Sequence, residues 1–141
     1  MSPSQPHEPN AASVALIRDG EVLLVERAFE PFKGIWTLPG GRREPDESIE
    51  ATAVRELMEE LGVAVESLRP VVLLGIGHGF RLQVFASDQF VGELVPSSEI
   101  AAWRWARPAA ISGLATTPEL DRVLAAAMAL YDRNSAVSRS G

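Results

Sequence analysis

Residues 46–61, DESIEATAVRELMEEL, are the feature that most constrains the fold of this chain. The segment consists largely of strong helix formers and contains neither Gly nor Pro. Asp46 stands where a side chain caps the first turn of a helix, and Gly62 stands where a glycine ends the last turn. The pattern therefore predicts a helix over residues 46–61.

Two kinds of side chain divide this predicted helix into two faces. A helical projection places an apolar set on one side, made up of Val54, Leu57, Met58 and Leu61. The other side carries Glu56, Glu59 and Glu60, which fall within about 100° of each other. We expect the apolar side to pack against a core and the acidic side to remain accessible.

Short β-rich segments lie on both sides of this helix. Apolar residues in 14–17 and 22–25 flank Asp19-Gly20, which is a strong signal for a tight hairpin. Extended segments are also predicted over residues 36–38, 68–76, 80–91 and 103–105, and a second helix is predicted to open at 117–119. Strands, helix, strands, helix is an order compatible with an α/β fold whose helices pack on a sheet.

The length and composition fit one domain of ordinary size. Of the 141 residues, 46% are hydrophobic and 23% are charged, and no apolar run reaches the ~20 residues that a transmembrane helix needs. Residues 1–11 and 133–141 are polar, so we expect a disordered leader, a folded domain over 12–132 and a disordered tail. The absence of Cys and of a secretory signal at the start favours the cytoplasm.

The charge of the chain limits its partners. A net charge of −6 and a pI near 4.9 argue against a nucleic-acid polymer, whose binding normally requires a basic surface. A small phosphate-bearing molecule remains compatible, because divalent cations can stand between the carboxylates of the protein and the phosphates of the ligand.

The acidic side of the predicted helix suggests such a cation site. Carboxylates at positions i, i+3 and i+4 repel one another unless a cation lies between them, and Mg²⁺ or Mn²⁺ with oxygen ligands is suited to that place. The competing interpretation is a solvated acidic surface. Pro39-Gly40-Gly41 favours the site, because glycines let the backbone approach the helix closely.

The spacing within residues 41–63 resembles the complete signature of the Nudix hydrolase family. Its fixed points are Gly41, Glu47, Arg55-Glu56-Leu57, Glu59-Glu60 and Gly62-Val63. The resemblance extends over about residues 12–131. It implies an α/β fold of the Nudix type, an α/β/α sandwich with a mixed β-sheet, and a pyrophosphohydrolase that uses Mg²⁺ or Mn²⁺ to cleave phosphoanhydride bonds.

The resemblance also implies a set of metal ligands and catalytic residues. The implied ligands are Glu56, Glu59, Glu60, the backbone carbonyl of Gly40, and Glu99, for which Glu93 and Asp88 are rivals. Glu56 and Glu59 are the predicted catalytic residues, with Glu56 as general base or as base and ligand together. A simple turn glycine at 40 and an exposed loop acid at 99 are the competing interpretations.

Arg55 and Glu47 are better interpreted as support for this site. A guanidinium beside three carboxylates can orient them through paired hydrogen bonds, and Glu47 can hold that guanidinium from the loop side.

A further group of residues is predicted to contact the substrate. Arg27 and Arg43 are candidates for holding a phosphate, and Trp36 and Phe80, with Phe32 as a further candidate, for stacking on a base. Solvated arginines and core aromatics are the competing interpretations. His78, in a Gly-rich stretch, is either a contact near the site or a turn histidine.

The loop over residues 26–38 resembles that of family members that act on ADP-ribose. The predicted function is Mg²⁺-dependent hydrolysis of a nucleoside diphosphate derivative (NDP-X) to NMP and X-phosphate. The alternatives are a pyrophosphatase that removes oxidised nucleoside triphosphates, and a ligand-sensing regulator. The family often forms homodimers, but no segment here indicates an interface.

Overall fold

Strand β1 (Ala11–Arg18) is the centre of the fold, and nearly all of its side chains are buried because both of its faces are covered. The computed structural model describes residues 9–75 and 79–140, with side chains as far as 131. The predicted leader lies largely outside these residues, and His78 lies outside them altogether.

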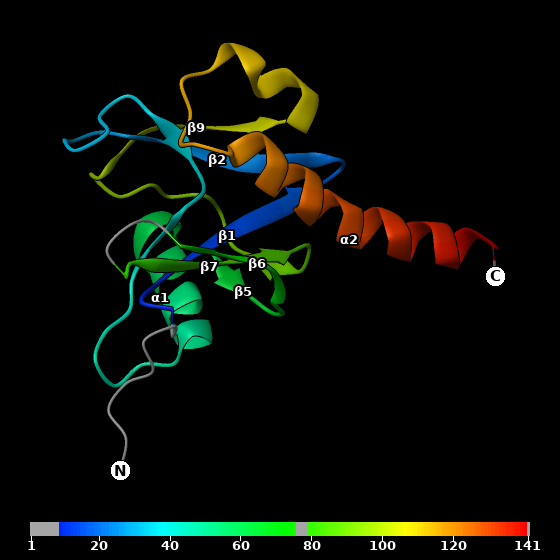
Figure 1. The fold of residues 1–141 in the computed structure, drawn as a ribbon, viewed down its shortest axis with the longest axis horizontal. Coiled ribbons are helices and arrows are strands. Elements are labelled where there is room, and N and C mark those ends of the chain that lie inside the picture. The colour runs from blue at the N-terminus through cyan, green and yellow to red at the C-terminus, as the bar shows by residue number, and fades with distance from the viewer. Residues whose placement is uncertain (1–8, 76–78, 141) are drawn as a thin grey trace.

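A seven-stranded sheet is built around β1 (Figure 1). Its strands are β1, β2 (Glu21–Arg27), β3 (Trp36–Thr37), β4 (Gly40–Arg42), β6 (Arg69–Gly75), β7 (Arg81–Ser87) and β9 (Ile100–Ala106). The path runs β3-β2-β1-β7-β6, with β4 paired to β1 and β9 paired to β2. Because β1 and β7 are parallel and the other pairs antiparallel, the sheet is mixed, as predicted.

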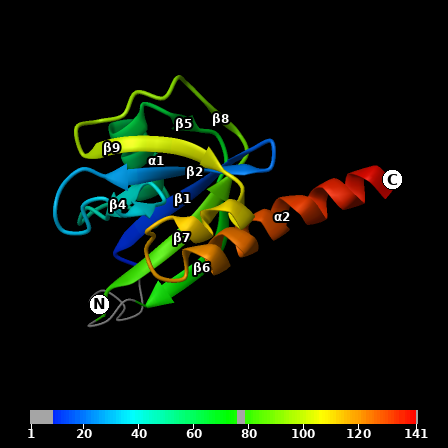
Figure 2. The ribbon, with the colours of Figure 1, turned by 90° about the horizontal axis from the view of Figure 1, so that it is seen from above.

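One helix covers each face of this sheet (Figure 2). Side chains of β1 and β2 alternate between two cores, as expected for strands that are buried on both sides. Helix α1 (Ile49–Leu61) packs on the face that carries Val14 and Leu23, and helix α2 (Leu120–Ser140) packs on the face that carries Ala15 and Leu24. The predicted α/β/α sandwich is confirmed.

The hairpin between β1 and β2 is also as predicted. Ile17 pairs with Val22, and Arg18 pairs with Glu21. The two turn residues between them, Asp19 and Gly20, have φ values of 55° and 79°. Asn, Asp and Gly are the residues that tolerate this left-handed conformation, so the Asp-Gly pair fits a tight hairpin.

Helix α1 begins later than predicted. Its N-cap is Ser48, whose backbone is extended and whose Oγ accepts a hydrogen bond from the Ala51 N–H at 3.0 Å. The prediction that Asp46 caps the helix is therefore wrong, because a serine closer to the first turn takes that place. The predicted end of the helix is confirmed. Gly62 adopts φ 71°, and its N–H donates to the carbonyls of Leu57 and Met58.

The buried stripe of α1 also differs from the prediction. Leu57 and Leu61 are fully buried together with Ala53, whereas Val54 and Met58 are 42% and 50% exposed. Ala53, Leu57 and Leu61 are spaced four residues apart and form one stripe against the sheet, which leaves Val54 and Met58 at its outer rim. The helix is thus rotated so that part of its acidic side faces the protein.

Other segments also differ from the sequence prediction in detail. The strand predicted over 80–91 ends at Ser87, whose hydroxyl bonds Gln89 in a turn. The next strand, β8 (Phe90–Val91), belongs to a separate two-stranded sheet with β5 (Ala64–Val65). A 3₁₀ helix, η1 (Pro108–Gly113), follows β9, and the α2 backbone continues as helix to Ser140. The domain limits of 12 and 132 stay a prediction.

In the described part of the chain, no helix is both long and apolar enough to span a membrane.

Candidate active site

A small acidic cavity lies between α1 and the segment before β9. Its volume is about 220 Å³, and it is lined by Glu56, Glu59, Glu60, Ser97, Ser98 and Glu99. The loop is tied to the end of the helix, because the N–H groups of Val95 and Ser97 donate to the carbonyls of Leu61 and Glu60. We call this cavity the acidic pocket.

The glycines of β4 allow α1 to approach the sheet closely. A Cβ on Gly41 would overlap the carboxylate of Glu56, and a Cβ on Gly40 would overlap the Ala12 carbonyl and Ser13 of β1. The Gly40 N–H also donates to Glu60 Oε1 at 3.3 Å. Two consecutive glycines are therefore required here by close packing, and they place the β4 backbone beside two of the acidic side chains.

Arg55 holds the carboxylates at the rim of the acidic pocket. Its Nε and one terminal nitrogen donate to the two oxygens of Glu47, at 2.6 Å and 3.0 Å. The other terminal nitrogen donates to Glu56 Oε2 at 3.1 Å and to Glu59 Oε1 at 3.0 Å. The expected ion pair between Arg55 and Glu47 is present, and it fixes the guanidinium from the loop side.

Glu47 is itself held by further donors. The Thr52 hydroxyl donates to Glu47 Oε1 at 2.8 Å, and the Glu44 N–H donates to the same oxygen at 3.0 Å. Its bond from Arg55 and these contacts lower the pKa of Glu47 to about 2. The same network raises the pKa of Arg55, chiefly through the bond to Glu47. Both groups therefore stay charged over a wide range of pH.

Two carboxyls of the acidic pocket have the opposite shift. Burial raises the pKa of Glu60 to about 8, and the nearby charges of Glu56 and Glu99 add to this effect. Burial also raises the pKa of Glu56, against the lowering effect of Arg55. The charge of Glu99 contributes to the raised pKa of both groups, although Glu99 lies far from them in the sequence. Its side chain therefore belongs to the same cavity.

This donor set fits a hard divalent cation. Burial and mutual repulsion disfavour the ionised forms of Glu56 and Glu60, and a cation between oxygen ligands removes that penalty. Among the described residues, no three acidic or histidine side chains already stand in a metal-holding arrangement. The carboxylates of Glu56 and Glu59 instead accept hydrogen bonds from Arg55, and the carboxylate of Glu60 accepts one from the Gly40 N–H.

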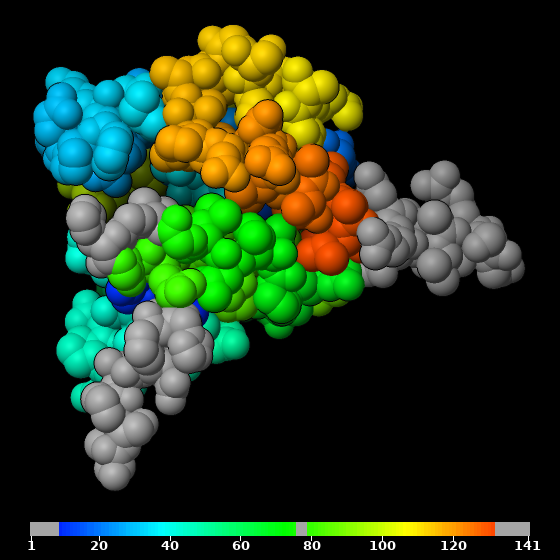
Figure 3. Space-filling model, viewed as in Figure 1, coloured from blue at the N-terminus to red at the C-terminus, as the bar shows by residue number. Residues whose placement is uncertain are grey.

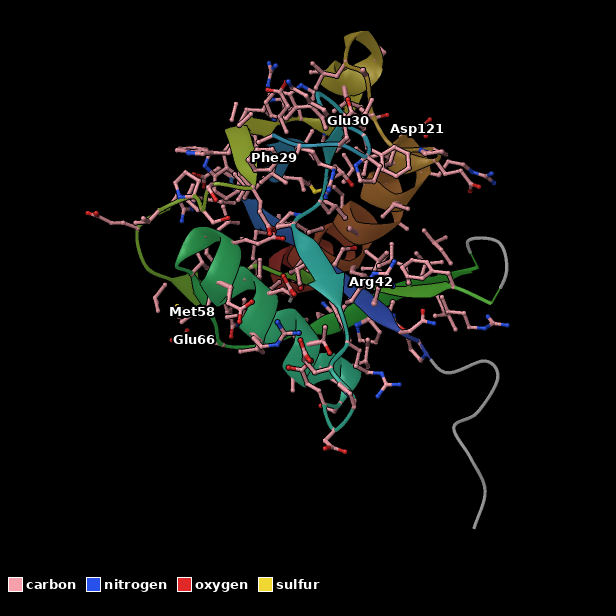
Figure 4. The ribbon with its side chains drawn as sticks, turned by 90° about the vertical axis from the view of Figure 1, so that its left-hand side faces the viewer. Phe29, Glu30, Arg42, Met58, Glu66 and Asp121 are labelled. Carbon is pink, nitrogen blue, oxygen red and sulfur yellow. The ribbon has the colours of Figure 1, made fainter. Side chains whose placement is uncertain are left out.

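A second, larger cavity lies on the α2 side of the sheet, and its lining includes Gly40 and Gly41, which lie against Glu60 and Glu56. Its volume is about 490 Å³ and its lining is mostly apolar. It is lined by Ala11, Ala12, Ser13, Phe32, Thr37, Leu38, Gly40, Gly41, Arg42, Leu74, Gly75, Phe80, Leu82, Val84, Thr117, Pro118, Glu119, Leu120 and Val123. We call it the apolar pocket. Figure 4 shows α1 beside β4, with Arg42 on β4 and Met58 on the outer side of the helix.

The predicted substrate residues are distributed unevenly around these two cavities. Phe80 lines the apolar pocket, with the Arg42 guanidinium 5.5 Å from its ring centre. Trp36 packs against the α2-side core and under Arg104 instead. Arg43 donates to the backbone carbonyls of Pro9 and Glu47.

Arg27 and the rivals of Glu99 complete this set. Arg27 donates to the Pro31 carbonyl at 2.9 Å, and its charge lowers the pKa of Glu60. Burial raises the pKa of Tyr131 in α2, and the charge of Asp88 adds to this effect. The backbone of Glu93 lies near Gly62 at the end of α1. Of the three loop acids considered, only Glu99 lines the acidic pocket.

Sequence reasoning missed several lining residues. Ser97 and Ser98 line the acidic pocket, and Thr37, Arg42, Thr117 and Glu119 line the apolar pocket. The hydroxyls of Thr37 and Thr117 lie 3.3 Å apart and join segments far apart in the sequence. The isolated bridge between Trp36 and Thr116 brings them together, and no local pattern signals it. Figure 3 shows the β2–β3 loop, in light blue, beside the segment that leads into α2, in orange.

Comparison with known families agrees with this geometry. Residues 7–127 match the family described as NUDIX domain. The chain belongs to the Nudix family. The match covers all residues that line the two pockets.

Two curated relatives and one solved structure illustrate the similarity. ADP-ribose pyrophosphatase from Methanocaldococcus jannaschii is 40% identical over 99 residues, 62% of this chain and 55% of that protein. An 8-oxo-dGDP phosphatase from Homo sapiens is 41% identical over 93 residues, 64% of this chain and 28% of that protein. The crystal structure of a MutT NUDIX hydrolase from Burkholderia pseudomallei has a TM-score of 0.74 and 28% identity, covering 83% of this chain and 96% of that one. The chain thus spans about a quarter to about half of the length of these curated relatives.

Proposed function

We propose that this protein hydrolyses the diphosphate linkage of a nucleoside diphosphate derivative, giving NMP and X-phosphate, with Mg²⁺ as the metal. The observation that carries the proposal is the pair of adjoining cavities. One collects Glu56, Glu59, Glu60 and Glu99, and the other is an apolar cavity of the size that holds small ligands. Gly40 and Gly41 line the apolar cavity, and their backbone lies against Glu60 and Glu56, so we propose that one elongated molecule occupies both cavities.

The acidic side chains are the metal-binding part of this proposal. Glu56, Glu59, Glu60 and Glu99, together with the carbonyl of Gly40, would hold the ion. A divalent ion held there would supply neutralisation of charge on the phosphate oxygens and would lower the pKa of a water. Mg²⁺ fits oxygen ligands of this kind, and Mn²⁺ accepts the same donors.

Glu56 is the proposed general base. Its carboxylate lies against Gly41 and accepts a hydrogen bond from Arg55, which restricts its orientation. Burial raises its pKa, which makes it a better proton acceptor when ionised. Glu56 takes a proton from the attacking water as the new oxygen–phosphorus bond forms. The bridging phosphorus–oxygen bond then breaks, and two phosphate monoesters leave.

The similarity to an ADP-ribose pyrophosphatase supports ADP-ribose as the first compound to try. The similarity to an 8-oxo-dGDP phosphatase supports oxidised nucleotides as the alternative. A regulator that only senses ligands is disfavoured, because four carboxylates, those of Glu56, Glu59, Glu60 and Glu99, are present in the acidic pocket.

A coupled assay separates the enzymatic alternatives. ADP-ribose, other NDP-sugars, dinucleotides, triphosphates and 8-oxo-dGTP are incubated with Mg²⁺ and with one of two coupling enzymes. Alkaline phosphatase reports the monoesters formed from NDP-X, and inorganic pyrophosphatase reports pyrophosphate formed from triphosphates. We expect the signal mainly in the first channel. A signal mainly in the second would replace the proposal by triphosphate hydrolysis, and silence in both, with ligand binding retained, would support a sensor.

A further inference from the structure

Thr52 is a polar residue on the buried side of α1, and its side chain is 0% exposed. The other buried residues of this helix are Ala53, Leu57 and Leu61, all of them apolar. Burial of a hydroxyl costs free energy unless the hydroxyl is hydrogen-bonded. The mechanism proposed above gives Thr52 no role, so its hydroxyl calls for an explanation.

The Thr52 hydroxyl has two acceptors within reach but only one proton to donate. Glu47 Oε1 lies at 2.8 Å and the Ser48 carbonyl lies at 3.0 Å. The Ser48 carbonyl already accepts the Thr52 N–H at 3.0 Å, as the first turn of the helix requires. A carboxylate is also the stronger acceptor. The hydroxyl proton therefore goes to Glu47.

This bond joins the loop between β4 and α1 to the helix itself. Figure 4 shows the loop running from β4 to the start of α1. The other donors to the Glu47 carboxylate are the Glu44 N–H, which belongs to the same loop, and the Arg55 guanidinium. Among the described residues, Thr52 and Arg55 are thus the two helix residues that hold Glu47. Without Thr52, Glu47 would be held on the helix side by the very group that it is meant to fix.

Arg55 transmits the position of Glu47 to the acidic pocket. Its Nε and one terminal nitrogen bond Glu47, while the other terminal nitrogen donates to Glu56 Oε2 and Glu59 Oε1. Because the guanidinium is planar and rigid, a rotation at the Glu47 end displaces the nitrogen at the other end. A loosely held Glu47 would therefore weaken the two bonds that orient the carboxylates.

We propose that Thr52 is a positioning residue for the acidic pocket. Its hydroxyl fixes Glu47, which in turn holds Arg55. Through Arg55, it determines where the carboxylates of Glu56 and Glu59 stand. The inference rests on the proposed function, which gives Glu56 its part in the chemical step. Since Thr52 lines neither pocket, its loss should reduce the rate of that step and leave substrate binding nearly unchanged.

Steady-state kinetics of three variants test the inference. Thr52→Val removes the hydroxyl and keeps the size of the side chain, Thr52→Ala removes the hydroxyl together with a methyl group, and Thr52→Ser keeps the hydroxyl. Valine and alanine should both lower kcat about 3- to 30-fold, with KM within about twofold of the wild type. Serine should restore most of kcat. Valine and alanine differ in packing, so similar losses in the two would point to the hydrogen bond.

The Nε–H proton of Arg55 provides a second readout that requires neither turnover nor metal. Its ¹H–¹⁵N NMR signal, assigned with Arg55→Lys and recorded in EDTA, should exchange slowly with water in the wild type, because Nε donates to Glu47 Oε2 at 2.6 Å. The signal should be retained in Thr52→Ser. In Thr52→Val it should exchange at least about threefold faster, because the carboxylate that protects it is less firmly held.

Two further variants separate positioning from a general effect on the core. Ser87→Ala removes an equally buried hydroxyl, which bonds Gln89 outside both pockets, so kcat and the Arg55 signal should stay at their wild-type values. In an Arg55→Lys background, Thr52→Val should lower kcat by less than about twofold further, because the group that Thr52 positions is already gone.

The inference is overturned by a wild-type kcat in Thr52→Val, by an unchanged Arg55 signal in that variant, or by an equal loss of kcat in Thr52→Ser. A full further loss in the Arg55→Lys background also overturns it, since Thr52 would then act by another route. If no substrate is hydrolysed while the Arg55 signal responds to Thr52→Val and not to Ser87→Ala, the proposed function fails and the positioning of Arg55 by Thr52 stands.

Discussion

The apolar pocket includes Gly40 and Gly41, which lie against two carboxylates of the acidic pocket, but the two pockets are built in different ways. The carboxylates of the acidic pocket come mainly from one helix and are fixed by charged hydrogen bonds, above all those of Arg55. The apolar pocket draws on β1, β4, β6, β7, the β2–β3 loop and the start of α2, and has few polar contacts of its own. Groups that act on phosphorus need fixed positions, whereas a flat apolar ligand needs mainly shape and exclusion of water.

This difference predicts that variants at the two pockets alter different quantities. Changes in the acidic pocket should reduce the rate of the chemical step, and changes in the apolar pocket should reduce affinity. The following predictions test the distinction, beginning with the largest expected effect.

Glu56→Gln should lower kcat by about 10² to 10⁴-fold, because the amide does not accept the proton from water. Steady-state kinetics with the best substrate of the panel measure this effect. Glu50→Gln, at an exposed position in the first turn of the same helix, is the control and should keep wild-type activity. Near-normal turnover in Glu56→Gln would remove Glu56 from the chemical step.

Leu57→Ala should lower the free energy of unfolding by about 2 to 5 kcal/mol, because Leu57 is fully buried between α1 and the sheet. Met58→Ala, one position along and half exposed, should cost less than about 1 kcal/mol. Urea denaturation of both variants compares them. An equal loss of unfolding free energy in the two variants would contradict the position of Leu57 on the buried side of α1 and of Met58 on its exposed side.

Arg55→Lys should lower kcat about 10- to 100-fold while leaving the fold intact. Lysine keeps the charge but loses the planar group that bonds Glu47 with two nitrogens and Glu56 and Glu59 with a third. Arg122→Lys, on the exposed side of α2, is the matched control. A Lys variant as active as the wild type would mean that the charge of Arg55 suffices.

The pH dependence of stability should change in Glu60→Gln, and this is the smallest expected effect. The folded pKa of Glu60, about 8, lies above its ordinary value of 4.5. Without metal, the folded state therefore binds more protons than the unfolded state between these two values, so stability should fall as pH rises from about 4.5 to 8. Glu60→Gln should flatten this fall in EDTA. A wild-type melting temperature that rises over the same range would contradict the shift.

The sequence predicted the acidic pocket better than the apolar one for a physical reason. Glu56, Glu59 and Glu60 are close in the chain, and helical spacing alone places them on one side. Glu99 lies near these residues because β9 pairs with β2, and helical spacing cannot reveal that pairing. Ser48 caps α1 in place of Asp46, and because Ser and Asp are both common N-cap residues, residue preference alone does not show which of the two is the cap. The exposed positions of Val54 and Met58 depended on which side of the helix meets the sheet.

The apolar pocket could not be predicted in the same way. Phe32 and Thr117 lie in segments separated by most of the chain and meet only because β3 runs beside residues 115–117. Phe80 was predicted because aromatic residues bind bases, and Trp36 was proposed for the same reason although it packs in the α2-side core. Residue type alone does not distinguish these two environments.

The most direct test compares kcat and KM for Glu56→Gln and Phe80→Ala on the best substrate of the panel. The account predicts that Glu56→Gln lowers kcat with little change in KM, and that Phe80→Ala raises KM with kcat within a few-fold of the wild type. Loss of kcat in both variants, with KM unchanged in both, would contradict the division between a pocket that cleaves and a pocket that binds.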